Sequence, residues 1–242
     1  MRKLGKITRL ATLAMALAAI AALFTHSPSV RAQDFNDDES RIQQGFAVAP
    51  VPLNLAGKNR ALLGLGSYLV NAVADCNGCH SAGPKTQYVN PTGNPYLLPG
   101  LFTGKTQINP QTYLGGGYDF DQLPGPFPGP GPGYAHIVSR NLTPDKYGFP
   151  EGHTFSDFVT ILRAGRDFDN AHPNCADPAN PDGHCLPFPF NGVSLQIMPW
   201  PTFHNMTDHD LLAIYTYLTA IPCLEGDPGV PPPPGPPQSR CH

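Results

Sequence analysis

The sequence lacks an apolar run that is long enough to cross a membrane as a helix. Its longest largely apolar run, from Leu10 to Phe24, contains 15 residues, whereas a membrane-spanning helix needs about 20. No cysteine directly follows this run, which argues against a lipid-anchored lipoprotein. The sequence also contains no internal repeat, so the chain is not an array of similar units.

The first 32 residues have the features of an export signal. Four basic residues precede the apolar run: Arg2, Lys3, Lys6 and Arg9. After the run, Val30-Arg31-Ala32 resembles a small-residue cleavage site. The pattern predicts a signal peptide over residues 1–32 and a periplasmic or otherwise exported protein. An uncleaved membrane anchor is the alternative.

Basic residues are scarce in the rest of the chain. All 18 acidic residues lie after position 32 but only ten of the 15 basic residues do, so this part has a net charge of −8 when its histidines are neutral. An acidic balance argues against nucleic acid as a partner. It favours a protein partner with a basic docking face, or it keeps an exported protein soluble.

Proline and glycine are abundant, and they limit regular structure. Many of the 30 prolines and 25 glycines lie in residues 84–134 and 222–237, where they disfavour helix and central strand. We therefore expect a mainly α protein whose short helices are separated by long Pro/Gly-rich loops. The expected divisions are an extended leader over residues 33–58, a helical domain over 59–224 and a Pro-rich tail over 225–242.

Three segments have the apolar spacing of helices: residues 59–73, 154–164 and 207–218. In the first, the expected apolar face consists of Leu62, Leu65, Leu69 and Val73. In the second, Thr154 with Asp157 is expected to cap the start and Gly165 to end the helix; in the third, Thr207 is the expected N-cap. The first helix leads directly into the motif that carries the chemistry.

That motif is Cys76-Asn77-Gly78-Cys79-His80, the attachment signature of c-type haem. Cys76 and Cys79 would add to the two haem vinyl groups, and His80 is then placed under the iron. Gly78 lets the backbone pass close to the ring. The alternatives are a disulfide within the pair or half of a zinc site. A zinc site needs a second pair of ligands at short spacing, and a thioredoxin-like motif follows a strand rather than a helix.

Methionine is scarce, and this limits the ligands that can complete the iron coordination. Two of the four methionines lie in the predicted signal peptide, which leaves Met198 and Met206. Met206 precedes the N-cap Thr207 and can pack on Leu211 as a hydrophobic staple, whereas Met198 lies in a proline-stiffened loop. We therefore expect Met198 to be the sixth ligand. The competing imidazoles are His136, His153, His172, His184, His204 and His209.

Four further cysteines favour an oxidising compartment. The expected disulfides are Cys175–Cys185 and Cys223–Cys241, out of three connectivities that four cysteines allow. His172 and His184 flank the first pair, so a metal site in that loop is the alternative.

Together these motifs resemble a class I cytochrome c domain. The resemblance rests on the helix containing Gly66-Ser67-Tyr68-Leu69-Val70, the haem motif, Met198-Pro199 and the last helix. More narrowly, the chain is similar to cytochrome c subunits of membrane-associated alcohol and gluconate dehydrogenases. The elements shared with those subunits are Gly115-Gly116, Asn141-Leu142-Thr143-Pro144-Asp145 and Arg163-Ala164-Gly165. The match covers about residues 59–222.

The resemblance implies a mainly α, cytochrome c-like domain wrapped round one covalent haem c. It also implies that the first and last helices cross, with Gly66 against the face that bears Tyr215 and Leu218. The leading interpretation is a periplasmic one-electron carrier with His80 and Met198 on the iron, whose partner is a dehydrogenase or a terminal oxidase and which meets the membrane only by association. One alternative is a haem enzyme or gas-binding protein with an open sixth position. Another is a disulfide-stapled binding module in which the haem is structural.

Overall fold

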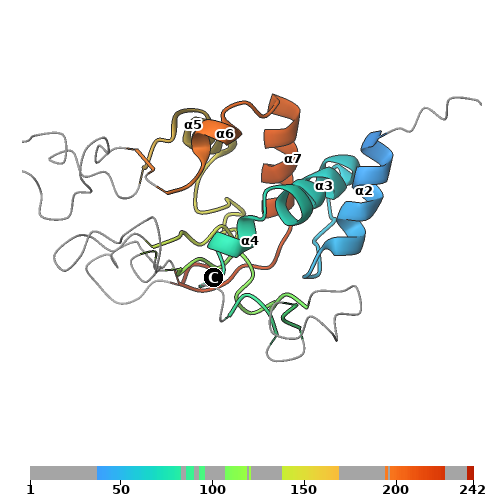
Figure 1. Ribbon diagram of the computed structural model, residues 1–242, viewed down its shortest axis with the longest axis horizontal. Coiled ribbons are helices and arrows are strands. Elements are labelled where there is room, and N and C mark those ends of the chain that lie inside the picture. Colours follow the sequence, from blue (N-terminus) through green and yellow to red (C-terminus); the bar gives the residue numbers. More distant parts are fainter. Residues whose placement is uncertain are drawn as a thin grey trace, which may run out of the picture. The chain divides into compact units, whose positions relative to one another are not determined.

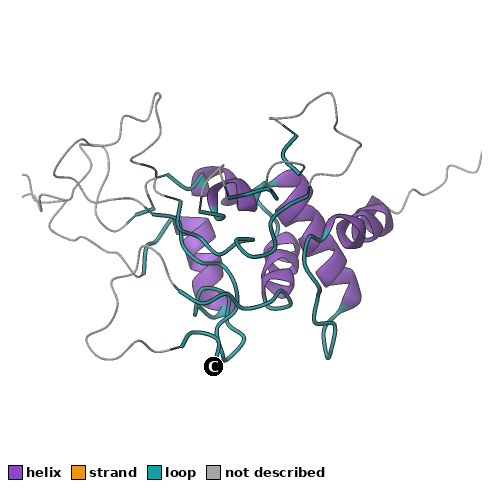
Figure 2. Ribbon diagram, turned by 90° about the horizontal axis from the view of Figure 1, so that it is seen from below, coloured by secondary structure: helices purple, strands orange, loops and turns teal. Residues whose placement is uncertain are grey.

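Helices provide the regular structure of the protein. The computed structural model describes residues 37–82, 86–89, 93–95, 107–118, 120, 138–168, 194–195, 197–226 and 239–242. Its elements are α2 (Asp37–Val48), α3 (Arg60–Tyr68), the π-helix η1 (Leu69–Val73), α4 (Cys76–Cys79), α5 (Phe155–Ala164), α6 (Trp200–Phe203) and α7 (Asp208–Leu218) (Figure 1). Within these ranges there are isolated antiparallel bridges but no strands, as Figure 2 shows. The expected mainly α class is confirmed.

None of the described helices is both long and apolar enough to span a membrane. The predicted signal peptide, residues 1–32, lies outside the described part of the chain. The predicted Cys175–Cys185 disulfide lies outside it too. The predicted Cys223–Cys241 disulfide is confirmed, with the two Cα atoms 5.7 Å apart.

α3 runs into a π-helical turn immediately before the cysteine motif. Asn59 caps the start of α3, because its side chain accepts hydrogen bonds from the amides of Ala61 and Leu62. At the other end the Ala74 amide donates to the Leu69 carbonyl at 2.8 Å, five residues back. A π turn adds one residue to the helical turn, so the apolar pattern shifts. Val73, which we expected on the buried face, is therefore 56% exposed.

α3 and α7 cross in close contact at Gly66. A Cβ atom placed on Gly66 would lie 1.9 Å from the Ala213 carbonyl oxygen and 2.8 Å from Cβ of Tyr217. The expected crossing is confirmed, but the face of α7 at the contact carries Ala213 and Tyr217 rather than Tyr215 and Leu218. Residues 215 and 217 are about 200° apart around a helix, so Tyr215 points elsewhere.

Tyr215 instead joins α7 to α5. Its ring lies 5.3 Å from that of Phe155 and 5.5 Å from that of Phe158. The caps predicted for these two helices are confirmed. Capping boxes start both of them, formed by Thr154 with Asp157 and by Thr207 with Asp210, and Gly165 ends α5 in a left-handed conformation.

The segment expected as an extended leader forms a helix instead. α2 packs on α3 so closely that a Cβ on Gly45 would lie 1.8 Å from the Gly64 carbonyl oxygen. The Ser67 hydroxyl donates to the Gly45 carbonyl at 2.7 Å. Residues 49–58, which follow α2, are irregular, and they too are anchored, since the Asn54 amide donates to the Ala220 carbonyl. The prediction was wrong because α2 is stabilised by this contact and has little apolar periodicity of its own.

The described residues from Asp38 to His242 form one compact unit. Its core is built from α3, η1, α7 and the segment around residue 113. The buried apolar residues of this core are Val51, Leu63, Leu65, Leu69, Val70, Tyr113, Leu114, Ala213, Ile214, Tyr217, Leu218, Ala220 and Ile221.

Candidate functional site

The two cysteines and the histidine of the predicted haem motif lie on one helical turn. α4 begins after Asp75, whose backbone is left-handed with φ 45°. The His80 amide donates to the Cys76 carbonyl at 3.0 Å. Cys76 is half-buried, Cys79 is exposed, and both are free thiols, so the disulfide considered as an alternative is not formed. Gly78 packs on Asp75, because a Cβ there would lie 2.7 Å from a carboxylate oxygen.

Both thiols are protonated at neutral pH. Burial raises the pKa of Cys76 to about 12, with a further contribution from the charge of Asp75. Burial and Asp75 also raise the pKa of Cys79. Redox-active Cys-x-x-Cys pairs have thiols of lowered pKa, so this pair differs from a thioredoxin-like site.

The His80 ring is held in one tautomer. Its Nδ1 lies 2.8 Å from the carbonyl oxygen of Arg140. A carbonyl can only accept, so Nδ1 carries the hydrogen and Nε2 has a free lone pair. Burial lowers the pKa of His80, and the bond to Arg140 opposes this shift. A neutral imidazole whose second nitrogen is engaged is the form that binds metals.

Gly116 allows the Arg140 carbonyl to reach His80. The Gly116 amide donates to the His80 carbonyl at 2.9 Å. On its other side, a Cβ on Gly116 would lie 2.4 Å from the Arg140 carbonyl carbon and oxygen. The backbone at Gly116 has φ +69°, which favours glycine. The Gly115-Gly116 element therefore lets two backbone segments meet beside the candidate ligand.

The Asn141–Asp145 element joins this segment to the end of α7. The Asn141 side chain donates to the carbonyls of Leu224 and Gly226 and accepts from the Thr143 amide. The Thr143 hydroxyl in turn accepts from the Leu224 amide at 3.0 Å. Asn141 and Thr143 are fully buried. Their role in the structure is to fix the chain that carries the Arg140 carbonyl.

Three buried polar side chains around the motif have nitrogen or oxygen atoms without a hydrogen bond. They are Asn77 Nδ2, Ser81 Oγ and both terminal nitrogens of Arg140. Arg140 is 8% exposed, and its guanidinium lies 3.5 Å from Asp167, beyond normal hydrogen-bond length. Buried polar groups are normally satisfied. The Arg140 guanidinium forms an ion pair with Asp167 that lacks a hydrogen bond, so its N–H groups suit a further carboxylate, and haem carries two propionates. The residues present therefore fit this cofactor.

Met198 lies in a loop that is clamped to the end of α5. The Trp200 ring, two residues on, covers Gly165, where a Cβ would lie 2.3 Å from a ring carbon. The Trp200 amide donates to the Met198 carbonyl at 2.7 Å. Arg163 also holds the loop, because its guanidinium donates to the His204 carbonyl and forms an ion pair with Asp208. The Arg163-Ala164-Gly165 element thus positions the Met198 loop.

The structure joins Cys76, Cys79 and His80 but not all four predicted site residues. Among the interactions described for this part of the chain, none links Met198 to the α4 turn. Met198 is half-buried. Met206 is also partly buried and packs against the core, whereas its expected staple contact with Leu211 stays a prediction.

The competing histidines fall into two groups. His136, His172 and His184 lie outside the described residues, and so does the alternative metal site beside Cys175. The His153 ring lies 5.5 Å from the Phe168 ring with the planes tilted by 44°, His204 donates from Nδ1 to the Arg163 carbonyl at 2.5 Å, and His209 is exposed. No group of three or more His, Cys, Asp or Glu side chains suited to a metal ion occurs within the described ranges.

Sequence reasoning did not identify Arg140 or a buried tyrosine pair near Cys76. The Tyr113 hydroxyl donates to Asn71 Oδ1 at 2.5 Å and lies 2.8 Å from the Tyr217 hydroxyl. Burial raises the pKa of both tyrosines. The position of Arg140 directly before the Asn141–Asp145 element was the only signal that the sequence offered.

Comparison with known proteins identifies no relative: the chain matches no family model, no curated protein and no solved structure. The chemistry of the site is therefore argued from its own residues.

Proposed function

We propose that this chain is an exported c-type cytochrome that carries single electrons on one covalent haem. The observation that carries the proposal is the α4 turn. It presents two protonated thiols and a neutral His80 whose Nδ1–H is engaged by the Arg140 carbonyl at 2.8 Å, which leaves Nε2 free for an iron. In this proposal the domain is cytochrome c-like, and its helices and Pro/Gly-rich loops together enclose the haem.

Each residue of the site has a distinct role in the proposal. Cys76 and Cys79 would form the thioethers to the haem, and His80 and Met198 would bind its iron. Arg140 pairs with a propionate. When bound, the haem supplies a one-electron couple, and thioether ligation together with burial favours its reduced form.

The proposed partners follow from charge and compartment. The chain after residue 32 has a net charge of −8, so it suits a redox partner with a basic face. We propose a periplasmic dehydrogenase or terminal oxidase, with association at the membrane only through that partner.

The test is expression of the full chain in a host that exports it and attaches c-type haem. Denatured wild-type protein should keep the mass and the spectrum of a covalent haem. Cys76→Ser with Cys79→Ser should lose both, whereas Cys223→Ser with Cys241→Ser should keep both. Wild-type protein without covalent haem overturns the proposal.

Carbon monoxide separates the electron carrier from a haem enzyme or gas-binding protein. With both axial positions filled, the ferrous protein should bind the gas slowly, because Met198 must leave first. Rapid binding to the ferrous form would contradict the carrier and indicate an open sixth position.

A further inference from the structure

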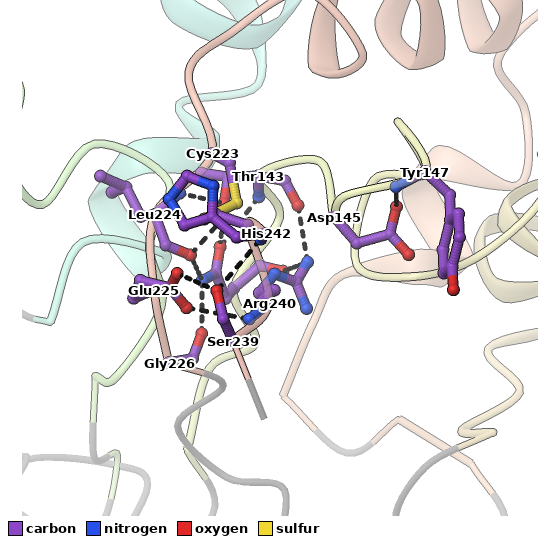
Figure 3. The surroundings of a disulfide bond; sticks show 12 residues. Thr143, Asp145, Tyr147, Cys223, Leu224, Glu225, Gly226, Ser239, Arg240 and His242 are labelled. Atoms are coloured by element: carbon purple, nitrogen blue, oxygen red, sulfur yellow. Dashed lines mark hydrogen bonds between the residues drawn. A yellow bond between two sulfur atoms is a disulfide. The ribbon is translucent and has the colours of Figure 1, made fainter. Parts of the chain in front are cut away.

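The C-terminal residues 239–242 return to the segment that supports His80 (Figure 3). The Cys223–Cys241 disulfide attaches them to the chain just after α7. Glu225 reinforces the attachment, since its carboxylate accepts from the Ser239 hydroxyl at 2.5 Å and from the Arg240 amide at 2.9 Å. We call residues 239–242 the tail.

Arg240 extends from the tail to the backbone that follows Arg140. Its guanidinium donates to the carbonyl of Asn141 at 3.2 Å and to the carbonyl of Thr143 at 2.6 Å. The Arg240 carbonyl accepts from the Lys146 amide at 2.8 Å. The tail therefore binds this backbone at three points.

The same backbone carries the carbonyl that orients His80. Residues 114–118 hold one side of the segment by backbone hydrogen bonds. The Leu142 amide donates to the Leu114 carbonyl, and the Gly117 amide donates to the Ser139 carbonyl. Asn141 is buried and its own side chain is used at Leu224 and Gly226. The tail adds the hydrogen bonds from the charged Arg240 guanidinium to the carbonyls of this segment, and such charge-assisted bonds are stronger than neutral ones.

We propose that the disulfide-linked tail is a strap and that Arg240 is a positioning residue for His80. By fixing the carbonyls of Asn141 and Thr143, Arg240 holds the adjacent Arg140 carbonyl against Nδ1–H of the His80 ring. This contact keeps Nε2 pointing toward the iron that it is proposed to bind. The importance of Nε2 rests on the proposed function, but the restraint on the ring does not.

The experiment measures exchange of the His80 Nδ1 hydrogen with solvent by nitrogen-15 NMR of the full-length protein as purified. A haem-loaded sample is studied in a diamagnetic ferrous state, with carbon monoxide added if the sixth position is open. Arg240→Ala should accelerate exchange about tenfold or more, because a hydrogen bond to a charged group is lost and the segment opens more often. Arg240→Lys, which keeps a charged donor, should restore much of the protection.

Ser239→Ala is the matched control, because it removes a tail contact without touching the Asn141 and Thr143 carbonyls. Its exchange rate should stay within about twofold of wild type. The proposal is overturned if Arg240→Ala leaves the rate unchanged, or if Ser239→Ala accelerates it equally, since the tail would then act only through general stability. Should Arg240→Ala fail to fold, Arg240→Gln is judged by the same criteria.

The mass of the intact protein keeps this result separate from the proposed function. A chain that carries no covalent haem contradicts the cytochrome proposal, yet its His80 ring signals still report whether Arg240 restrains the ring. A haem-loaded chain with unaltered exchange contradicts the strap alone.

Discussion

Single glycines decide where backbone segments meet beside the candidate ligand. Gly116 lies between the His80 carbonyl, to which its amide donates, and the Arg140 carbonyl, which a Cβ would meet at 2.4 Å. The neighbouring Gly115 is less crowded, since a Cβ there would first meet the mobile end of Leu224 at 3.0 Å. The two positions therefore form a matched pair.

We predict that Gly116→Ala lowers the free energy of unfolding by about 2–5 kcal/mol. A left-handed backbone costs a non-glycine residue about 1–2 kcal/mol, and overpacking adds about 1–3 kcal/mol. Denaturant unfolding of the purified protein measures the loss. Gly115→Ala should change stability by less than about 1 kcal/mol, and equal losses in the two variants would contradict the packing at Gly116.

The second residue-scale prediction concerns the axial ligands. Met198→Ala should abolish the near-infrared sulfur-to-iron charge-transfer band of the ferric protein, because it removes the proposed thioether ligand. Met206→Ala should keep the band and lower stability by about 2–5 kcal/mol, as expected for truncating a methionine packed against the core. The reverse pattern would exchange the roles of the two residues.

At this scale the sequence predicted what covalent chemistry dictates and missed what folding brings together. Cys76, Cys79 and His80 lie within five residues, so the spacing alone predicts that one turn presents all three, and α4 confirms this placement; their binding of haem stays a prediction. The Arg140 carbonyl reaches His80 only because Gly116 permits the approach, and no local pattern encodes that contact. The burial of the Arg140 guanidinium could not be predicted from the sequence either, because burial depends on tertiary packing.

At the scale of elements, small residues set the distances between helices. Gly45 meets Gly64 where α2 packs on α3, and Gly66 meets Ala213 where α3 crosses α7. The α3–α7 crossing fixes the position of the α4 turn, because η1 continues α3 directly into the cysteine motif. Periodicity predicted α3, α5 and α7, and the capping residues predicted the starts of α5 and α7 and the end of α5. It failed for α2, which depends on its neighbour, and at Val73, where the π turn shifts the face.

We predict that Gly66→Ala destabilises the protein by about 1–2 kcal/mol. The new methyl group would lie 1.9 Å from the Ala213 carbonyl oxygen, so the helices must separate, and overpacking of this kind costs about 1–3 kcal/mol or more. The gain of about 1 kcal/mol in helix propensity offsets only part of this cost. Thermal and denaturant unfolding give the difference.

Ala61→Leu is the control for the crossing. Ala61 is exposed on the same helix, so a larger side chain there should change stability by less than about 0.5 kcal/mol. A Gly66→Ala variant as stable as wild type would mean that α3 and α7 are not in backbone contact.

At the scale of the whole molecule, the disulfide closes the chain around the end of α7. Cys223 and Cys241 are 18 positions apart, and a loop of about this length is stabilised by about 3 kcal/mol in the chain-entropy model. We predict that Cys223→Ser with Cys241→Ser loses about that much stability while haem attachment persists. Denaturant unfolding followed at the haem absorbance measures the loss, and loss of covalent haem would contradict separate roles for the two cysteine pairs.

The last prediction is that cooperative folding requires haem. The site contains buried polar atoms of Asn77, Ser81 and Arg140 that make no hydrogen bond, and each such atom costs about 1–3 kcal/mol, although the ion pair with Asp167 compensates part of the cost at Arg140. A domain has only about 5–15 kcal/mol of net stability, so these costs are a large share of it unless a ligand offsets them. A group that binds only the folded state stabilises it further.

Cys76→Ser with Cys79→Ser should therefore give a chain without a sharp calorimetric transition and with little near-ultraviolet circular dichroism. Cys79→Ser alone, which leaves one thioether, should retain a transition at reduced temperature. The informative comparison is between these two variants, because both lack a cysteine at position 79 and differ in whether the cofactor is still tethered. A cooperative transition in the double variant at the wild-type temperature would show that the core of α3, η1 and α7 is sufficient by itself and that the buried guanidinium of Arg140 costs less than its lack of hydrogen bonds implies.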